Sequence, residues 1–157
     1  YNILFIILRI IEQEMNLVEI KYKSDLYKKE IELRDEVLRA PLGLKFKKED
    51  LEAEVDELRY GLLDNNGELT SCLLVRILDN SVAKIRQMAV KEELRGKGLG
   101  RELIKKVESE LKKKKFNKIE LHARMYAKVF YDKLRYIETG DVFTEIGIPH
   151  IKMEKDI

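Results

Sequence analysis

The feature of this sequence that most constrains its fold is a glycine-rich turn between a strand-like run and an amphipathic helix. The strand-like run is Val82–Val90, and the turn reads Arg95-Gly96-Lys97-Gly98-Leu99-Gly100. After the turn, apolar residues recur with helical spacing at Leu103, Ile104, Val107 and Leu111. The first N–H groups of a helix lack partners inside it and lie at the positive end of its dipole. Glycines there let an anion approach the backbone closely, so the turn predicts a pyrophosphate-binding site.

Three known phosphate-binding patterns can be compared with this turn. A P-loop needs Ser or Thr after its Gly-Lys pair, but Lys97 is followed by glycine. A Rossmann turn needs a third glycine where Arg101 stands, and Glu120, which is near the spacing of a ribose-binding acid, lies inside a strand-like run instead of at its end. The third pattern, Arg/Gln-x-x-Gly-x-Gly/Ala, is matched in full by Arg95, Gly98 and Gly100.

Length and charge limit the classes of function. The 157 residues predict one domain with a sizeable core. Lys and Arg number 31 and Asp and Glu number 29, so the net charge of +2 gives no general electrostatic case for nucleic acid or an anionic membrane. The basic run at 112–115 ends a helix, where cations favour the dipole. A single cysteine, Cys72, excludes an intrachain disulfide and favours a reducing, cytoplasmic location.

The N-terminal residues differ from the rest of the chain. Residues 1–11 are nearly all apolar, which is too short a run to span a bilayer, and they lack the basic start and cleavage site of a signal peptide. We therefore divide the chain into an apolar extension, residues 1–14, and a domain, residues 15–157. An apolar run must pack against something, so we expect it to dock on its own domain or on a second copy in a homodimer.

Periodicity and turn residues predict an α/β domain. Ser24 is a suitable N-cap for a helix that Pro41 and Gly43 end, and Asp64-Asn65-Asn66-Gly67 forms a hairpin turn. We expect the apolar residues Leu26, Tyr27, Ile31, Val37 and Leu38 to face inward on that helix. Strands are expected at 17–22, 59–63, 68–78, 82–90, 118–123, 136–139 and 150–154. Helices are expected at 24–39, 48–58, 100–114 and 127–134.

The order of these elements predicts their arrangement. Hairpins come before a single strand-helix-strand crossover, which predicts a mixed, mostly antiparallel sheet flanked by helices. The parallel pair in this sheet is formed by 82–90 and 118–123. A ligand should lie at the carboxyl ends of these two strands.

Two further motifs connect the turn with a known family. Phe130-Tyr131-x-Lys133-Leu134-x-Tyr136 and Gly147-Ile148-Pro149-His150-Ile151-x-Met153 accompany it. Over about residues 17–153 the chain resembles the GCN5-related N-acetyltransferases (GNAT), and most closely their ElaA-like branch. Their order of elements is the predicted one. Two departures stand out: Arg135 occupies the usual place of a glycine, and Arg124 that of an asparagine that binds the pantetheine arm.

The resemblance implies an enzyme that transfers an acetyl group from acetyl-coenzyme A directly to a primary amine, without a metal. It implies pantetheine bonds to the strand around Met88, Ala89 and Val90. It gives the pyrophosphate to the backbone of Arg95, Gly96, Lys97, Gly98, Leu99 and Gly100, with the side chains of Arg95, Lys97 and Arg101 as local cations. Arg124 and Tyr131 are further cofactor contacts, and Tyr131 is the expected general acid for the leaving thiolate.

Other roles stay open at the level of sequence. His122, His150 and Glu145 are candidates for the base that deprotonates the amine; Glu57 is comparable, and a water molecule is an alternative. Acidic residues at 50–57 either attract a cationic amine or form a solvated helix face. The acceptor is a small molecule or a peptide. A module that binds acyl-coenzyme A without turnover is the alternative function.

Overall fold

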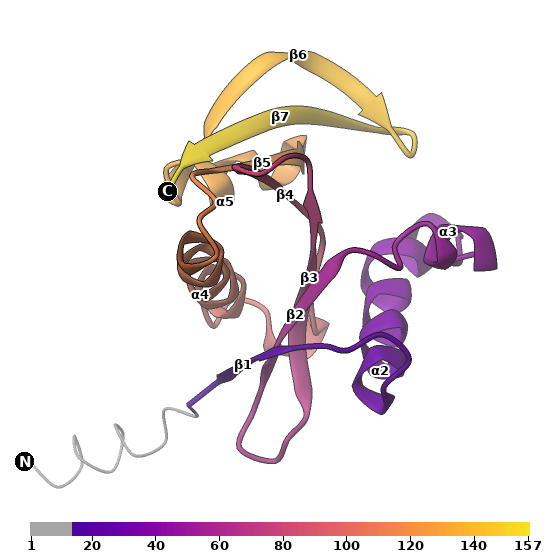
Figure 1. Cartoon of the computed structure of the whole chain (residues 1–157). Coiled ribbons are helices and arrows are strands. Elements are labelled where there is room, and N and C mark those ends of the chain that lie inside the picture. Colours follow the sequence, from indigo (N-terminus) through magenta and orange to yellow (C-terminus); the bar gives the residue numbers. More distant parts are fainter. Residues whose placement is uncertain (1–13) are drawn as a thin grey trace, which may run out of the picture.

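A computed structural model describes residues 14–157, which form a seven-stranded sheet with helices on both faces (Figure 1). The strand order is β1-β2-β3-β4-β5-β7-β6, and all neighbours are antiparallel except the parallel pair β4–β5. This confirms the predicted mixed sheet and its parallel pair. The strands are β1 (Asn16–Glu19), β2 (Leu58–Leu63), β3 (Leu69–Ile77), β4 (Val82–Val90), β5 (Lys118–Arg124), β6 (Ile137–Glu145) and β7 (Ile148–Asp156). The helices are α2 (Asp25–Arg34), α3 (Lys48–Glu52), α4 (Leu99–Lys113) and α5 (Lys128–Lys133). A π-helical segment, η1 (Asp35–Arg39), continues α2, and η2 (Ala40–Leu42), η3 (Glu92–Leu94) and η4 (Met125–Ala127) are short 3-10 helices. The predicted docking of residues 1–11 lies outside the described residues.

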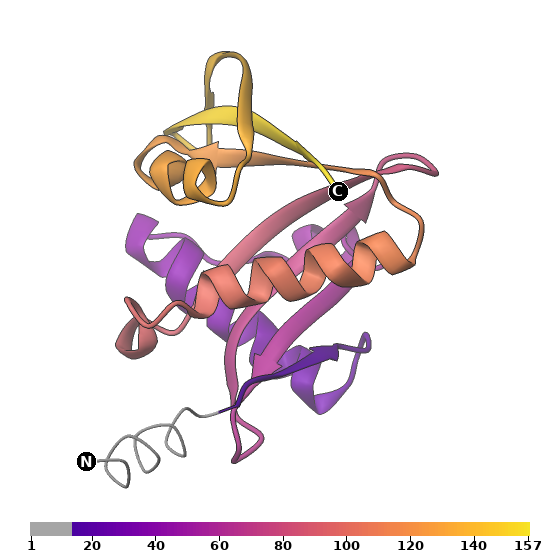
Figure 2. The ribbon, with the colours of Figure 1, turned by 90° about the vertical axis from the view of Figure 1, so that its left-hand side faces the viewer.

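Each face of the sheet has its own core. Helix α4 lays its apolar stripe against β2, β3 and β4, and Figure 2 shows it running across that face. Helix α2 packs on the opposite face, against Cys72 of β3 and Ala89 of β4. Burial, with Glu30 nearby, raises the pKa of the Cys72 thiol, so the thiol stays protonated.

The first helix begins as predicted but buries an unexpected pair of charges. The N–H of Tyr27 donates to the Ser24 hydroxyl at 3.1 Å, which confirms the N-cap. Of the apolar residues expected to face inward, only Tyr27 is fully buried, while the others pack half-buried around the second core. Glu30 and Arg34, both 0% exposed, take the most buried positions. An apolar stripe could not predict them because their burial depends on partners elsewhere in the chain.

The second helix and the last two strands differ in length from the predictions. Helix α3 is only five residues long, because its acidic sequence has no apolar stripe to bury and the following turn carries Glu54 and Glu57 into the interior. Strands β6 and β7 are nine residues each, whereas 136–139 and 150–154 were expected. Most of β6 is exposed at the edge of the sheet, so it lacks the apolar alternation that marks a strand in sequence.

Among residues 14–157 no helix is long and apolar enough to cross a membrane. Within the same residues, no group of three or more His, Cys, Asp or Glu side chains has the arrangement of a metal site.

Candidate functional site

The site begins where the two parallel strands separate. β4 and β5 pair from Val82 opposite Lys118 to Ile85 opposite Leu121, and the pairing stops there. Just beyond, β4 carries a bulge, because its register with β3 shifts between Cys72 and Leu74. Gln87 lies in this bulge with a positive φ of 54°. The bulge and the separation together open the carboxyl ends of the pair, where the topology predicts a ligand.

The separated part of β4 directs backbone groups into this opening. The N–H of Lys91 donates to Thr70 O on β3 at 3.0 Å. Since backbone groups alternate along a strand, the N–H groups of Val90 and Met88 point away from β3 and toward the gap. The side chain of Ala89 packs into the core under α2 and does not line the gap. The gap therefore offers strand-like donors to an extended ligand.

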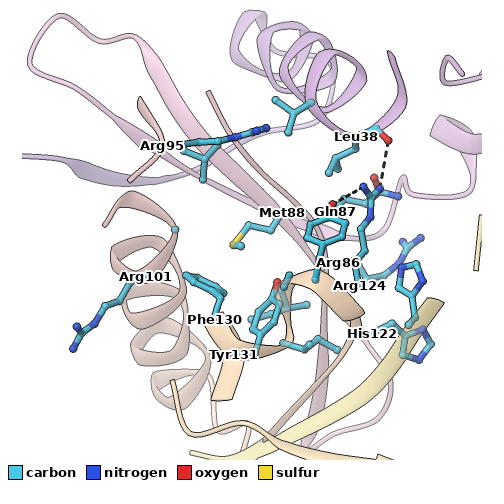
Figure 3. Close-up of a pocket in the computed structure, with 18 of the residues that line it drawn as sticks. Leu38, Arg86, Gln87, Met88, Arg95, Arg101, His122, Arg124, Phe130 and Tyr131 are labelled. Atoms are coloured by element: carbon cyan, nitrogen blue, oxygen red, sulfur yellow. Dashed lines mark hydrogen bonds between the residues drawn. The ribbon is translucent and has the colours of Figure 1, made fainter. Parts of the chain in front are cut away.

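A cavity of about 900 Å³ fills this gap and extends past both strands. It joins the glycine turn to the ends of β5 and β6 (Figure 3). Its lining includes Met88, Val90, Arg95, Gly96, Gly98, Leu99, Gly100, Arg101, His122, Arg124, Phe130, Tyr131, Glu145 and His150. All of these were predicted site residues except Phe130, which belongs to a predicted motif. The volume of the cavity lies within the range of small-molecule binding sites.

The glycine turn has the geometry needed to hold a phosphate. Gly98 is the N-cap of α4, with φ 78° and ψ 12°, and the first helical bond runs from the N–H of Glu102 to Gly98 O at 3.0 Å. The N–H groups of residues 98–101 therefore have no partner within the helix. A Cβ at Gly96 or Gly98 would meet no other atom within 4 Å, so the space over the turn is open. The turn fits the predicted pyrophosphate cradle.

Gly100 serves a different purpose from Gly98. A Cβ there would lie 3.3 Å from Cζ of Phe130 and 3.7 Å from Cγ2 of Val90. The absence of a side chain thus lets α5 approach α4 at the edge of the cavity.

The three predicted cations near the turn differ in position. Arg95 lines the cavity, whereas Lys97 is exposed outside it and the Arg101 guanidinium points outward (Figure 3).

Tyr131 stands in the middle of the cavity wall. It lies on α5, and its ring packs edge-on against Phe130 and Tyr136 at centroid distances of 5.0 and 5.9 Å. Figure 3 shows its hydroxyl directed into the cavity. Burial, assisted by Tyr126 and opposed by Arg124, raises the pKa of Tyr131 to about 12. The hydroxyl therefore carries its proton at neutral pH and can donate it.

The structure brings three of the candidate bases together. His122 is on β5, Glu145 ends β6 and His150 is on β7, three strands that are neighbours in the sheet. His122 Nδ1 lies 3.1 Å from Glu145 Oε1, and His150 Nε2 lies 3.6 Å from Glu145 Oε2. Phe143 packs edge-on against His122 and stacks on His150. One carboxylate is thus held between two imidazoles.

Hydrogen bonds assign protons within this cluster. His150 Nδ1 lies 2.7 Å from Ile148 O, so it carries the hydrogen and leaves Nε2 as the acceptor in the neutral ring. His122 Nδ1 lies 3.1 Å from Glu145 Oε1 and 3.3 Å from Lys84 Nζ. With a hydrogen, Nδ1 can donate to the carboxylate, and without one it can accept from the ammonium, but it cannot do both at once. The carboxylate is nearer, so we assign the hydrogen to Nδ1 and the bond to Glu145.

Electrostatics keep Glu145 ionised. Partial burial opposes ionisation, but the hydrogen bond from His122, the two imidazoles and Lys84 outweigh it and lower the pKa of Glu145. In turn, burial lowers the pKa of the Lys84 ammonium, although Glu145 acts in the opposite direction. The cluster therefore holds a carboxylate, with an imidazole beside it that can exchange a proton with a ligand.

Two other predicted residues make different contacts. Glu57 is buried, with its carboxylate 2.6 Å from Arg76 Nη2 and in contact with Arg86, and it does not line the cavity. Arg124 Nη1 donates to the Tyr126 hydroxyl at 3.0 Å, and its Nη2 donates to Leu38 O on η1 at 3.4 Å. The contacts of Arg124 thus reach toward the helices instead of the glycine turn.

The prediction from sequence missed a set of cations on the cavity wall. They are Arg39, Arg76, Lys84 and Arg86. No motif surrounds them. Alternation along β4, however, places Lys84 and Arg86 on one face of the strand, and this spacing in the sequence could have indicated that the two cations face the same way.

Comparisons with known proteins agree with this geometry. The sequence pattern of the acetyltransferase (GNAT) domain matches residues 34–157. The YyaT protein of Bacillus subtilis is 35% identical over 75 residues, which are 48% of this chain and 51% of YyaT. Among solved structures, ElaA of Escherichia coli has a TM-score of 0.74 at 22% identity, over 90% of this chain and 99% of ElaA. A GNAT-family acetyltransferase of Elizabethkingia anophelis, with acetyl-CoA bound, has a TM-score of 0.70 at 17% identity, over 91% and 98% of the two chains.

The fold is the mixed α/β fold of the GNAT acetyltransferase structures. The chain belongs to the GNAT acetyltransferase domain family, because the family pattern covers most of its length. The matched region spans about half the length of the curated relatives. The structural neighbours are below 25% identity and support the fold.

Proposed function

We propose that the protein is an N-acetyltransferase that uses acetyl-coenzyme A to acetylate a primary amine. The observation that carries the proposal is one continuous cavity, which leads from the N–H groups at the start of α4 past Tyr131 to the cluster at Glu145. Along its length, such a cavity can bind a phosphate first and an extended arm next, and it ends at a protein group that accepts a proton. The sequence motifs, the family membership and the geometry support the same activity.

The backbone carries most of the proposed cofactor binding. The N–H groups of residues 98–101 and the side chain of Arg95 hold the pyrophosphate. The N–H groups of Met88 and Val90 bind the extended arm, and the one nearest the acyl carbonyl stabilises negative charge that develops on its oxygen. Acetyl-coenzyme A, when bound, supplies an acetyl group activated as a thioester.

The side chains of the cavity carry the proposed proton transfers. His122, held by Glu145, removes a proton from the attacking amine, which forms the new C–N bond as the C–S bond breaks. Tyr131 donates its proton to the departing sulfur and is reprotonated from solvent. His150 Nε2 lies 3.6 Å from the other carboxylate oxygen, so a proton on this nitrogen would pair His150 with Glu145.

Calorimetry and thiol release test the proposal together. We expect the full chain to bind acetyl-coenzyme A and to release free thiol when an amine is added from a panel of amino acids, polyamines and peptide N-termini. Binding without thiol release across the panel would favour the non-catalytic binding module. Absence of binding would contradict the proposed function outright.

A further inference from the structure

The end of the cavity away from the glycine turn is strongly cationic. Five cationic side chains line it: Arg39, Arg76, Lys84, Arg86 and Arg124. Among the described residues, Glu57 is the carboxylate that forms salt bridges with these cations, whereas Glu145 and Glu120 lie near Lys84, and Asp50 and Glu54 near Arg39, without a salt bridge to them. Figure 3 shows Arg86, His122 and Arg124 grouped at this end, apart from Arg95.

Two of these cations are paired with a carboxylate. Arg76 and Arg86 share the buried carboxylate of Glu57. Lys84 lies 3.3 Å from His122 Nδ1, with Glu145 and Glu120 nearby. The Glu57 carboxylate is nearly excluded from solvent, so this pairing neutralises part of the charge inside the wall. Glu54 is likewise buried, paired with Arg34. The acidic residues at 54 and 57 therefore do not form an anionic face for a cationic amine.

Arg39 and Arg124 have no such partner within residues 14–157. Arg124 donates only to neutral oxygens, those of Tyr126 and Leu38. Arg39 lies over the ring of Phe46, at 4.6 Å from its centroid. Asp50, an acid near Arg39, accepts the N–H of Lys47 at 2.9 Å.

The two arginines are close enough to affect each other. Arg124 contacts the carbonyl of Leu38, the residue that precedes Arg39. Burial lowers the pKa of Arg39; Asp50 opposes this shift and Arg124 adds to it. Two half-buried guanidiniums that face one cavity repel each other, and an anion between them would relieve this repulsion. A planar guanidinium matches a carboxylate with two parallel hydrogen bonds.

The distance between the arginine pair, Arg39 and Arg124, and the proposed base His122 indicates the size of the ligand. His122 and Arg124 are two residues apart on β5, so both side chains leave the same face about 7 Å apart along the strand. Building on the proposed function, we propose that the acceptor is a small amine that also carries a carboxylate, such as an amino acid. Its carboxylate binds Arg39 and Arg124, and its amine lies at His122 and Glu145.

Matched pairs of acceptors test this assignment. Each amino acid is compared with its own carboxamide, and phosphoethanolamine with ethanolamine, by thiol release at fixed acetyl-coenzyme A. We expect kcat/KM to be at least about tenfold higher for the amino acid than for its carboxamide. Equal or faster turnover of the carboxamide overturns the inference, and a preference for phosphoethanolamine over every amino acid reassigns the pair to a phosphate.

Variants locate the effect at the two arginines. Arg124→Gln and Arg39→Gln should raise KM for the amino acid about tenfold or more and change KM for the carboxamide much less. Arg39→Gln should also preserve the Kd of acetyl-coenzyme A. Arg135→Gln, an exposed arginine outside the cavity, is the matched control and should change none of these values. Unchanged KM for the amino acid in both variants contradicts the inference.

A separate measurement distinguishes this inference from the proposed function. If no amine is acetylated although acetyl-coenzyme A binds, the proposed function fails and the carboxylate site is judged by binding alone. Calorimetry then compares an amino acid with its carboxamide on the protein saturated with coenzyme A. Tighter binding of the amino acid, lost in Arg124→Gln, supports the carboxylate site, and equal binding overturns it.

Discussion

Two buried tyrosines illustrate how position decides the role of a single hydroxyl. Tyr131 and Tyr136 pack against each other with ring centroids 5.9 Å apart. The Tyr131 hydroxyl faces the cavity, whereas the Tyr136 hydroxyl is buried with no hydrogen-bond partner among the described residues. Burial raises the pKa of both, so both are neutral at physiological pH. Only Tyr131 can meet a leaving group.

Replacing each tyrosine with phenylalanine separates catalysis from packing. Tyr131→Phe should lower kcat about a hundredfold or more where departure of the thiolate limits the rate, with little change in the Kd of acetyl-coenzyme A. Tyr136→Phe is the matched control: it removes a buried hydroxyl that has no partner, so activity should hold and the melting temperature should stay or rise. Steady-state kinetics and thermal unfolding measure both. A normal kcat in Tyr131→Phe, with chemistry limiting, would leave Tyr131 as a packing residue.

The glycine turn is tested by the same substitution at two glycines. Gly98 and Gly67 have φ values of 78° and 76°, and neither has an atom within 4 Å of its missing Cβ. Valine at either position should cost about 1–2 kcal/mol of stability, since it forces a side chain into the left-handed region. Only Gly98→Val should also weaken acetyl-coenzyme A binding, by about tenfold or more, because its side chain enters the phosphate space. If calorimetry gave both variants the wild-type affinity, the cradle would lie elsewhere.

At the scale of elements, a buried ion cluster ties α2 to the turn after α3. Arg34 Nε lies 2.5 Å from Glu30 Oε1, and its Nη1 and Nη2 donate to Glu54 at 3.1 and 3.0 Å. Arg34 and Glu30 are 0% exposed, so water screens neither charge. The carbonyl of Glu54 also accepts from Arg59 at 2.6 Å. The cluster thereby fixes the segment that carries Arg39 over the cavity.

Removing the central charge should destabilise the fold strongly. Arg34→Met should lower the free energy of unfolding by about 3–5 kcal/mol, because two buried carboxylates lose their counterion. Lys28→Met is the control on the same helix; its partner Asp25 is fully exposed, so we expect a change within about 0.5 kcal/mol. Urea unfolding of both variants measures the difference. Equal, small losses would mean that the cluster is not important for stability.

Elements with strong periodicity were predictable, and elements defined by partners were not. The spacing of Leu103, Ile104, Val107 and Leu111 predicted α4, and all four are 0% exposed. The exposed strand β6 has no such pattern, and its length depends on pairing with β7. The site divides in the same way. The glycine turn and Tyr131 lie in local motifs, whereas the cluster of His122, Glu145 and His150 forms only when three strands align.

At the scale of the whole molecule, alkaline pH should unfold the protein through its tyrosines. Burial raises the pKa of Tyr60 and Tyr131 to about 12, while in the unfolded chain both ionise near about 10. Above pH of about 10 the unfolded chain loses protons that the folded chain keeps, so stability falls by about 1.4 kcal/mol per tyrosine per pH unit until the folded pKa is reached. Below pH of about 10 both tyrosines are protonated in the folded and the unfolded chain, so their full contribution to stability is present.

Denaturant unfolding between neutral and strongly alkaline pH checks this prediction. The variant Tyr60→Phe removes one of these two hydroxyls and should lose less stability with rising pH than the wild type. A wild-type stability that stays flat up to pH of about 11 would contradict burial of these hydroxyls. Tyrosinate absorbance should report the same delayed ionisation in the folded state.

The central claim is that one cavity holds acetyl-coenzyme A from the start of α4 to the gap between β4 and β5. A crystal structure of the protein with acetyl-coenzyme A tests it most directly. The pyrophosphate should lie on the N–H groups of residues 98–101, at hydrogen-bond distances of about 2.7–3.2 Å. The thioester should lie between the backbone of Val90 and the hydroxyl of Tyr131. A pyrophosphate bound away from the glycine turn, or a thioester outside the gap, would contradict the account.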